Sequence, residues 1–292
     1  MRFGIIANMA RPGAGKVIER IVRWAADHDV ELHFSDSLTD HVGADHSLMP
    51  ECDLPDQAEL IVCLGGDGTM LATARTVGRR GTPILGINLG YLGFLTQLTP
   101  TALEETLTAI RANKYQLEKR MVAEVEIDGG PVMEHCCALN DVVIDRGQVS
   151  RLINLDLYAN DYLTCSYAAD GLIISTPTGS TAYSLAVGGP IINPLMKAFI
   201  ATPISAFALT TRPIIFSDSD KLRVVTRSKH ADPVLTLDGQ VACNLPRESS
   251  LHIRKADYDI NFVVFRQNSF YDVLRSKLHW GRLPEGTEGG GA

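Results

Sequence analysis

Residues 60–77 read LIVCLGGDGTMLATARTV, a strand, a tight turn and a helix in direct succession. Leu60–Leu64 is an unbroken apolar run, which is typical of a strand buried on both faces of a parallel sheet. The glycine-rich turn Gly65-Gly66-Asp67-Gly68-Thr69 follows immediately, and Met70–Val77 continues as a predicted helix. A strand that turns directly into a helix is the first part of a βαβ unit. We therefore predict a parallel sheet with helices packed against it.

Segments on either side of this stretch continue the alternation of strands and helices. Short apolar runs predict strands at Arg2–Ala7, Val30–Phe34 and Pro83–Ile87. Apolar residues at helical spacing predict helices at Lys16–Ala26 and Ala102–Ile110. Residues 36–56 are rich in Asp, Ser and His and are predicted to form a loop. Residues 1–120 thus predict an α/β domain that contains the GGDGT turn.

The periodicity changes near Met121, where apolar and polar residues begin to alternate. Pairs of short alternating runs are joined by Ala159-Asn160-Asp161 and by Asp238-Gly239. Asn, Asp and Gly tolerate the positive φ angles that tight hairpin loops require. Repeated hairpins predict an all-β, sandwich-like domain over residues 121–267.

The composition bounds the kind of partner and the compartment. The 292 residues carry a formal charge of −7, which argues against broad contact with nucleic acid because phosphates require a basic face. The six cysteines include no CxxC pair, which favours reduced thiols over a disulfide framework or a zinc site. There is no signal-peptide pattern and no apolar run of about 20 residues, so we expect a cytoplasmic protein without membrane contact.

The glycine-rich turn is the first candidate for chemistry. Glycines let backbone N–H groups approach a phosphate closely, and a helix N-terminus favours an anion. Asp67 would repel that phosphate unless it accepts a proton from an attacking hydroxyl or binds a metal that bridges the phosphates. The alternative is a structural turn in which Asp67 or Thr69 caps the helix.

Two further segments are candidates for substrate binding. Residues 175–183 read STPTGSTAY, whose hydroxyls suit recognition of ribose or phosphate, although an N-capping Ser or Thr is the plainer alternative. Asn140-Asp141 is a polar pair within an apolar segment, and either it faces a ligand or it is an ordinary turn. Leaving such a pair buried without partners would cost on the order of 1–3 kcal/mol.

Other known functional motifs are incomplete or absent. Residues 10–17 resemble a P-loop, but Ala10 replaces its first glycine and Val17 replaces the Ser or Thr that holds magnesium. The dinucleotide fingerprint GxGxxG is incomplete because position 71 is Leu. The histidines show no metal-ligand spacing, and Ser180 does not lie in a GxSxG elbow.

Taken together, these segments resemble the bacterial NAD kinases over nearly the whole chain. The resemblance rests on Gly65–Thr69, on GINLGYLGFL at 86–95, on Asn140-Asp141, on residues 170–190 and on Tyr271–Trp280. The GGDGT element alone is weak because diacylglycerol, sphingosine and 6-phosphofructokinase relatives carry similar versions. The run DGLIISTPTGSTAYSL from Asp170 is highly specific.

The resemblance implies transfer of phosphate from ATP to the 2′-hydroxyl of the adenosine ribose of NAD, giving NADP. Asp67 matches the catalytic carboxylate, proposed as the general base, and Mg²⁺ is expected to be held mainly through the ATP phosphates, with no metal ligand assigned on the protein. The substrate-binding residues implied by the motifs are Gly68, Asn140, Asp141, Arg151, Asp170, Thr181, Ala182, Tyr183, Ser184, Leu185, Ala186 and Gln240.

The family resemblance also implies a two-domain fold with the nucleotide site between the domains. The C-terminal segment 268–292 is expected to rejoin the first domain, and a homodimer or homotetramer is expected. Three positions depart from relatives. Asp141 stands where Glu is frequent, Ala186 where Ser can occur, and Ala168 where some relatives have a basic residue. Discrimination between NAD and NADH stays open, as does the choice among ATP, another triphosphate and polyphosphate.

Two rival functions remain at this stage. A lipid or sphingoid kinase would share the GGDGT element, but it would need membrane contact, and the chain shows no basic amphipathic helix. A nucleotide sensor would bind NAD without turnover.

Overall fold

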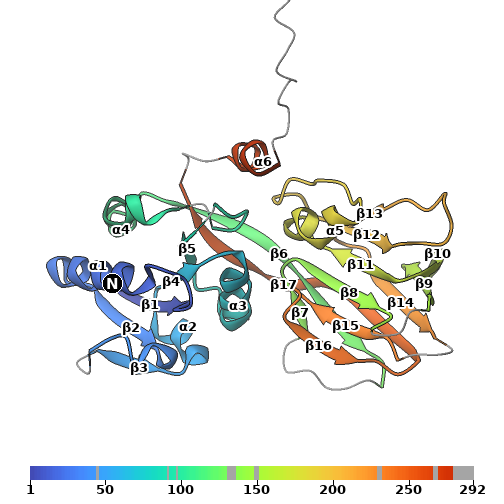
Figure 1. Ribbon diagram of the computed structural model, residues 1–292, viewed down its shortest axis with the longest axis horizontal. Helices are drawn as coiled ribbons and strands as arrows, with labels where there is room; N and C mark the ends of the chain where they lie inside the picture. Colours follow the sequence, from blue (N-terminus) through green and yellow to red (C-terminus); the bar gives the residue numbers. More distant parts are fainter. Residues whose placement is uncertain are drawn as a thin grey trace, which may run out of the picture.

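The computed structural model describes residues 1–43, 46–90, 92–96, 98–129, 136–147, 151–228, 232–265 and 269–278. It consists of an α/β half and a β-rich half that lie side by side (Figure 1). Within the described residues, no helix is long and apolar enough to cross a membrane.

The N-terminal half is a parallel sheet with helices on both faces. Its strands, in the spatial order β5-β4-β1-β2-β3, are β1 (Arg2–Ala7), β2 (Glu31–Ser35), β3 (Ser47–Met49), β4 (Leu60–Gly65) and β5 (Ile84–Asn88). Its helices are α1 (Ala14–His28), α2 (Leu54–Gln57), α3 (Asp67–Val77) and α4 (Leu103–Arg111). The α1 and α4 helices cover one face, and α2 and α3 cover the other.

The central strand β4 is buried on both faces, as its unbroken apolar run predicts. Val62 and Leu64 pack in the cluster beneath α1 and α4, whereas Ile61 and Cys63 pack beneath α2 and α3. Successive side chains of a strand point to opposite faces, so a strand with a helical layer on each side needs apolar residues throughout.

The loop predicted over residues 36–56 is incorrect in part. The strand β3 pairs in parallel with β2, and the short helix α2 begins at Leu54 with a proline in its first turn. A strand of three residues is too short to show a period, so the alternation that would identify it is missing from the sequence.

The C-terminal half is a sandwich of two sheets. One is antiparallel, in the order β13-β12-β11-β8-β15-β16; the other continues the N-terminal sheet through β17, β14, β9 and β10, with β6 and β7 beside it. The strands are β6 (Gln116–Ile127), β7 (Cys137–Ala138), β8 (Asp141–Asp145), β9 (Ile153–Ala159), β10 (Tyr162–Ala169), β11 (Gly171–Ser175), β12 (Ala198–Ile204), β13 (Ile214–Ser217), β14 (Leu222–Arg227), β15 (Val234–Leu237), β16 (Val241–Asn244) and β17 (Glu248–Val264).

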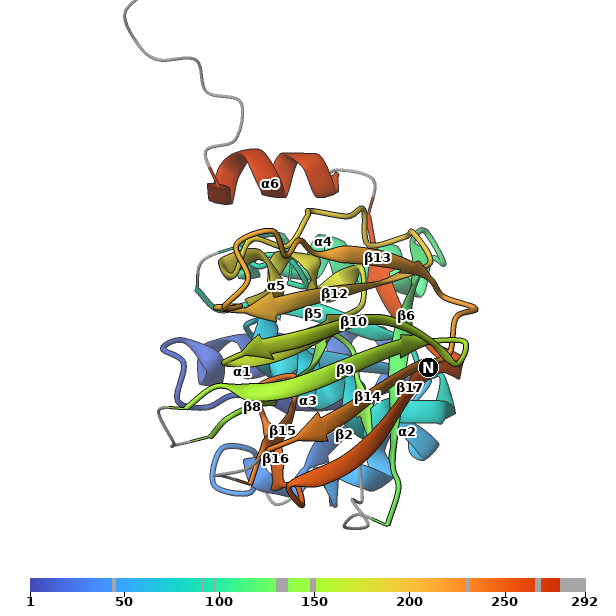
Figure 2. The ribbon, with the colours of Figure 1, turned by 90° about the vertical axis from the view of Figure 1, so that its right-hand side faces the viewer.

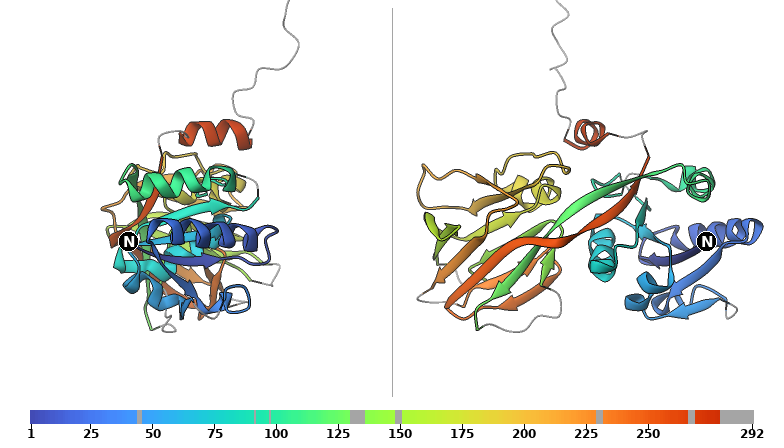
Figure 3. Two further views of the ribbon diagram at one scale, coloured as in Figure 1. Left: turned by 90° about the vertical axis from the view of Figure 1, so that its left-hand side faces the viewer. Right: turned by 180° about the vertical axis from the view of Figure 1, so that it is seen from behind.

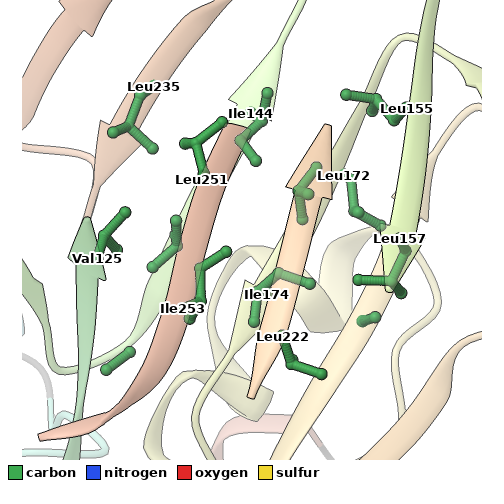
Figure 4. Packing of buried hydrophobic residues seen from close by; sticks show 14 of the residues in the cluster. Val125, Ile144, Leu155, Leu157, Leu172, Ile174, Leu222, Leu235, Leu251 and Ile253 are labelled. Atoms are coloured by element: carbon green, nitrogen blue, oxygen red, sulfur yellow. The ribbon is translucent and has the colours of Figure 1, made fainter. Parts of the chain in front are cut away.

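The core of the sandwich lies between its two sheets. Figure 4 shows Leu172 and Ile174 of one sheet facing Leu155, Leu157 and Leu222 of the other. The α/β and sandwich-like architecture predicted from the change of period is therefore confirmed.

Two long strands connect the halves. The strands β6 and β17 pair with each other along their length and run from the sandwich into the α/β half (Figure 3). There β17 joins the parallel sheet through the pair Phe262 and Ile84. Residue 120, the predicted domain boundary, lies within β6, so the division into 1–120 and 121–267 stays a prediction.

Hairpin turns form where Asx and Gly residues predict them. Asn160 and Asp161 have φ angles of 50° and 69°, and Asp238 and Gly239 have 53° and 65°. The first pair joins β9 to β10, and the second joins β15 to β16.

The last described helix, α6 (Phe270–Leu278), lies over the junction between the halves (Figure 1), and the side view shows it above β12 and β13 (Figure 2). Phe270 packs against Phe94 of the α/β half, with ring centroids 6.5 Å apart. On the other side, Asn193 Nδ2 of the β-rich half donates a hydrogen bond to the Tyr271 hydroxyl (3.4 Å). The helix therefore contacts both halves, and residues 279–292 lie outside the described chain.

Candidate active site

Asp67 is the first residue of α3, and its carboxylate turns toward the loop that follows β5. Oδ2 accepts a hydrogen bond from the Phe94 N–H (2.9 Å). Oδ1 accepts from the Leu95 N–H (3.1 Å), the Thr96 N–H (3.2 Å) and the Thr96 hydroxyl (3.1 Å). Asp67 is half-buried, and its two oxygens accept these four hydrogen bonds.

The close approach of the loop requires a glycine at position 93. A Cβ atom there would lie 1.9 Å from Asp67 Oδ1, which no side chain could tolerate. This contact gives a physical reason for the glycine in the GINLGYLGFL segment. The loop after β5 and the turn after β4 therefore form one structure around the carboxylate.

The adjacent residue, Gly68, contacts the β-rich half. Its carbonyl oxygen accepts a hydrogen bond from Nε2 of Gln240 (2.8 Å), which lies in the β15–β16 turn. Gln240 Oε1 in turn accepts from Arg75 Nη2 (3.1 Å), two turns along α3. Gln240 was predicted to contact substrate, and here its side chain joins the two halves.

Asp238 holds the backbone of the Asn140-Asp141 segment in place. Its carboxylate accepts hydrogen bonds from the backbone N–H groups of Leu139 (3.0 Å), Asn140 (2.7 Å) and Asp141 (3.2 Å). Arg75 Nη2 lies 3.9 Å from the same carboxylate. The polar pair is therefore a turn at Asn140 that leads into β8 at Asp141, and the buried Asp238 carboxylate holds its backbone.

A cavity of about 380 Å³ opens above this turn and extends along β8. Its lining includes Asn140, Asp141, Ala182, Tyr183 and Asp238. These residues come from three separate segments, the first and last of which lie more than 90 positions apart in the sequence. The structure thus brings four of the predicted binding residues to one cavity wall.

Burial and charge change the acidity of both carboxylates at this cavity. Burial, and secondly the negative charge of Asp238, together raise the pKa of Asp141 to about 7. Burial also raises the pKa of Asp238, but three N–H donors and Arg75 oppose the rise. Asp238 therefore holds the negative charge, and Asp141 is the group of the pair that takes up a proton.

The hydroxyl-rich segment is built differently from its prediction. The hydroxyls of Thr176 and Ser180 donate to the backbone oxygens of Leu139 (2.5 Å) and Pro177 (2.7 Å). Ser175, Thr176, Ser180 and Ser184 are fully buried. These hydroxyls hold the loop together because a tightly folded loop must satisfy its buried backbone groups. Only part of the segment, such as the half-exposed Tyr183, faces the cavity.

The remaining predicted binding residues vary in position. The Ser184 hydroxyl meets Thr202 (3.0 Å) inside the protein, so only its backbone could face a ligand. Thr181 bonds to the Thr178 carbonyl oxygen (3.3 Å), Leu185 is half-buried, and Ala186 is exposed. Asp170 lies at the opposite end of β11 from Asp141 and pairs with Arg146 (2.7 Å). Arg151 is exposed on the loop before β9.

Several residues near the candidate site carry no recognisable signal in the sequence. Thr96, Arg75 and Asp238 act through contacts between segments distant in sequence, and no local pattern reveals these contacts. Arg11 is a further case, because it lies in a segment that is incomplete as a P-loop and that therefore carried no prediction. Its Nη2 atom lies 3.8 Å from where a Cβ of Gly66 would stand, so a cation lies beside the glycine-rich turn.

A larger cavity of about 660 Å³ lies on the other side of Asp238, behind α3. Arg75, Cys137 and Tyr258 are among its lining residues, whereas Asp67 and Tyr183 are not. Although this cavity is larger, its lining includes neither Asp67 nor the Asn140-Asp141 pair, so we take the cavity of about 380 Å³ as the candidate site.

Comparison with known protein families identifies both halves. Residues 3–115 match the ATP-NAD kinase N-terminal domain, and residues 139–265 match the ATP-NAD kinase C-terminal domain. The fold and the site therefore define a kinase, a phosphotransferase with its glycine-rich turn facing a β-rich domain. The chain belongs to the ATP-NAD kinase family.

Relatives and solved structures agree with this membership. The chain is 39% identical over 282 residues to an NAD kinase of Geobacter sulfurreducens, covering 96% of this chain and 99% of the relative. An NAD kinase of Thermoanaerobacter pseudethanolicus is 36% identical over 278 residues, covering 95% and 98%.

Two solved structures share the fold at 24% identity. Yeast NADH kinase complexed with NADH has a TM-score of 0.88 and covers 96% of this chain and 88% of that one. An NAD kinase from Archaeoglobus fulgidus in complex with ATP has a TM-score of 0.76 and covers 96% and 99%.

Proposed function

We propose that the protein transfers the γ-phosphoryl group of ATP to the 2′-hydroxyl of the adenosine ribose of NAD, giving NADP. The observation that carries this proposal is the Asp67 carboxylate, held by four hydrogen bonds at the turn between β4 and α3. Phosphoryl transfer needs an oriented nucleophile and stabilised charge more than covalent chemistry by the protein. The fixed carboxylate can orient the attacking hydroxyl, and the N-terminus of α3 favours the negative charge of the phosphate.

Asp67 accepts the proton of the ribose hydroxyl as the phosphoryl group transfers. Gly68 places its backbone beside the same ribose, and the Gln240 contact holds Gly68 in place. General acid–base catalysis of this kind contributes about 10²- to 10⁴-fold to the rate.

NAD occupies the cavity between the Asn140-Asp141 turn and α5 (Tyr183–Ala186). Asn140 and Asp141 can hydrogen-bond ribose hydroxyls or the carboxamide, and Tyr183 offers a ring for stacking. The other assigned contacts are Thr181, Ala182, Ser184, Leu185 and Ala186. Asp170 and Arg151 are assigned as well, but they are not among the residues that line this cavity.

ATP binds at the glycine-rich turn, where Arg11 lies beside Gly66. Mg²⁺ would be held mainly by the triphosphate; Asp67 offers an oxygen of the type that Mg²⁺ prefers, but no metal ligand is assigned on the protein. When bound, the ion neutralises charge on the transferring group. Within the described part of the chain, no three His, Cys, Asp or Glu side chains gather in a metal-binding cluster.

The assembly and compartment are part of the same proposal. A homodimer or homotetramer is supported by apolar side chains left exposed on the β12–β13 loop, where Phe207 and Leu209 are 78% and 91% exposed. A cytoplasmic location is supported by the six cysteines, all of which are described and remain thiols.

The test is to assay wild type and Asp67→Asn with NAD, ATP and Mg²⁺, scoring the phosphorylated dinucleotide. We expect Asp67→Asn to lose about 10²-fold or more in kcat while the Kd for NAD stays within a factor of about three. Asp27→Asn, an exposed change on α1, is the matched control. Unchanged turnover in Asp67→Asn would remove Asp67 from the reaction.

The same assay separates the rival functions. A lipid kinase would phosphorylate diacylglycerol and leave NAD unchanged, and a sensor would bind NAD without forming product. Replacing ATP with polyphosphate, and NAD with NADH, resolves donor and acceptor preference.

A further inference from the structure

The two oxygens of Asp67 have unequal surroundings. Oδ1 accepts three hydrogen bonds, from the Leu95 N–H, the Thr96 N–H and the Thr96 hydroxyl. Among the described residues, Oδ2 accepts one, from the Phe94 N–H. A carboxylate oxygen offers about two lone-pair sites. Oδ1 is therefore fully used by the protein, and Oδ2 keeps a site for another donor.

Thr96 is fixed on the other side by Asn88. Asn88 Nδ2 donates to the Thr96 hydroxyl oxygen (2.7 Å), and both residues are almost fully buried. The Asn88 amide orientation is set because its Oδ1 accepts from the Gly90 N–H (2.7 Å). An amide nitrogen cannot accept a hydrogen bond. The single hydroxyl proton of Thr96 therefore points to Asp67.

This arrangement holds the carboxylate in one rotation. Asn88 ends β5, which is hydrogen-bonded to β4 next to the glycine-rich turn. The relay from Asn88 through Thr96 to Asp67 is thus anchored in the parallel sheet rather than in a free loop. Close contact at Gly93 leaves the carboxylate no room to move toward the loop.

The geometry points to Thr96 as a positioning residue that turns Asp67 so that Oδ2 receives the ribose proton. This inference rests on the proposed function and adds which oxygen reacts and what orients it. The ribose O–H bond breaks, its proton passes to Oδ2, and the ribose oxygen forms the new bond to the γ-phosphorus as the bond to ADP breaks. Thr96 itself touches no reacting atom.

The test compares Thr96→Val, which keeps the shape and removes the hydroxyl, with Thr96→Ser, which keeps the hydroxyl. We expect Thr96→Val to lower kcat by about 10- to 100-fold, the usual effect of losing a supporting hydrogen bond to a reacting group. The KM for NAD should change by less than about threefold, and Thr96→Ser should retain most of the activity.

A double-mutant cycle distinguishes an effect that passes through Asp67 from a general loss of structure at position 96. In the Asp67→Asn background, Thr96→Val should cause no further loss, because its effect passes through that carboxylate. Wild-type kcat in Thr96→Val, an equal loss in the Asp67→Asn background, or a Thr96→Ser as damaged as Thr96→Val would each overturn the inference. If Thr96→Val folds poorly, Thr96→Ala removes the same hydroxyl without the extra methyl group.

The two levels of the proposal fail separately. If wild-type protein does not phosphorylate NAD, the proposed function is wrong. If wild type is active and Asp67→Asn is inactive while Thr96→Val is fully active, the proposed function stands and only the positioning role is wrong.

Discussion

Asp141 is a carboxyl group that the protein buries beside another carboxylate. Its side chain is 4% exposed, and its charged neighbour Asp238 already takes the backbone N–H donors of the turn. The Tyr183 backbone N–H is the donor left to Asp141. A buried carboxyl group with few donors favours its neutral form. Asp141 is thus kept at a cost to stability, which is expected of a residue retained for binding.

That cost depends on pH. The pKa of Asp141 rises from 3.8 to about 7 in the folded protein. Between about pH 4 and pH 7 the folded protein therefore keeps a proton that the unfolded chain has lost. The free energy of unfolding falls as the pH rises through this window. At about 1.4 kcal/mol for each pH unit, the loss is on the order of 4 kcal/mol by pH 8.

We predict that Asp141→Asn, which stays neutral, melts several degrees higher than wild type at pH 8 without ligand. The difference in Tm should shrink as the pH falls toward 4, where folded Asp141 is protonated and the unfolded chain begins to take up the same proton. Thermal denaturation between pH 4 and pH 8 measures this, with Asp27→Asn as the exposed control. A Tm difference that is the same at every pH would show that Asp141 does not titrate in this range.

At the residue scale, the sequence points to the proposed base, Asp67, but not to the residues that support it. Asp67 stands out because a carboxylate is unexpected in a phosphate-binding turn. Thr96 and Asp238 do not stand out, because each acts through hydrogen bonds to residues 29 to 99 positions away. The hydroxyls of residues 175–184 suggested ligand contacts, but several of them are buried and bond within the protein. Composition does not distinguish a buried hydroxyl from one that faces a ligand.

Among the elements, α3 connects the chemistry to the β-rich half. It begins at Asp67, and Arg75, two turns later, contacts Gln240 and Asp238 at the β15–β16 turn. Gln240 closes the connection by bonding to the Gly68 carbonyl oxygen. The position of Asp67 relative to the Asn140-Asp141 turn is therefore set by one helix and one hairpin.

We predict that Gln240→Ala lowers kcat/KM for NAD by about 5- to 30-fold, because two hydrogen bonds of about 1 kcal/mol each are lost. If Gln240 joins the halves, the Tm should also fall in the absence of NAD. If it only contacts substrate, the ligand-free Tm should stay unchanged and KM alone should rise. Gln116→Ala, an exposed glutamine at the start of β6, is the control.

At the element scale, regular elements were predictable and short ones were not. The buried strand β4 follows from its unbroken apolar run, the amphipathic helix α1 follows from its helical period, and the hairpins follow from their Asx and Gly turns. The strand β3 and the helix α2 are only three and four residues long, so tertiary pairing rather than local pattern creates them. The long crossing of β6 and β17 is likewise a tertiary feature that no window of sequence shows.

The whole molecule leaves apolar side chains exposed at the outer edge of the sandwich. Phe207 and Leu209 lie on the loop between β12 and β13, and Leu195 and Met196 lie just before β12. The β13 strand is itself the edge of its sheet, where backbone groups lack a neighbouring strand among the described residues. Exposed apolar residues beside a free edge are typical of an interface.

We predict that Leu209→Glu converts a wild-type oligomer into a smaller species, because a charge would be buried at the interface without a partner. Light scattering coupled to size exclusion measures the mass of each species, and Leu117→Glu, a half-exposed leucine on β6, is the control. The variant should keep its ligand-free fold, since Leu209 is 91% exposed and contributes little to the core. Activity measured on the same fractions then shows whether the site between the two halves is complete in a single chain. A Leu209→Glu protein with the mass of wild type would place the interface elsewhere on the molecule.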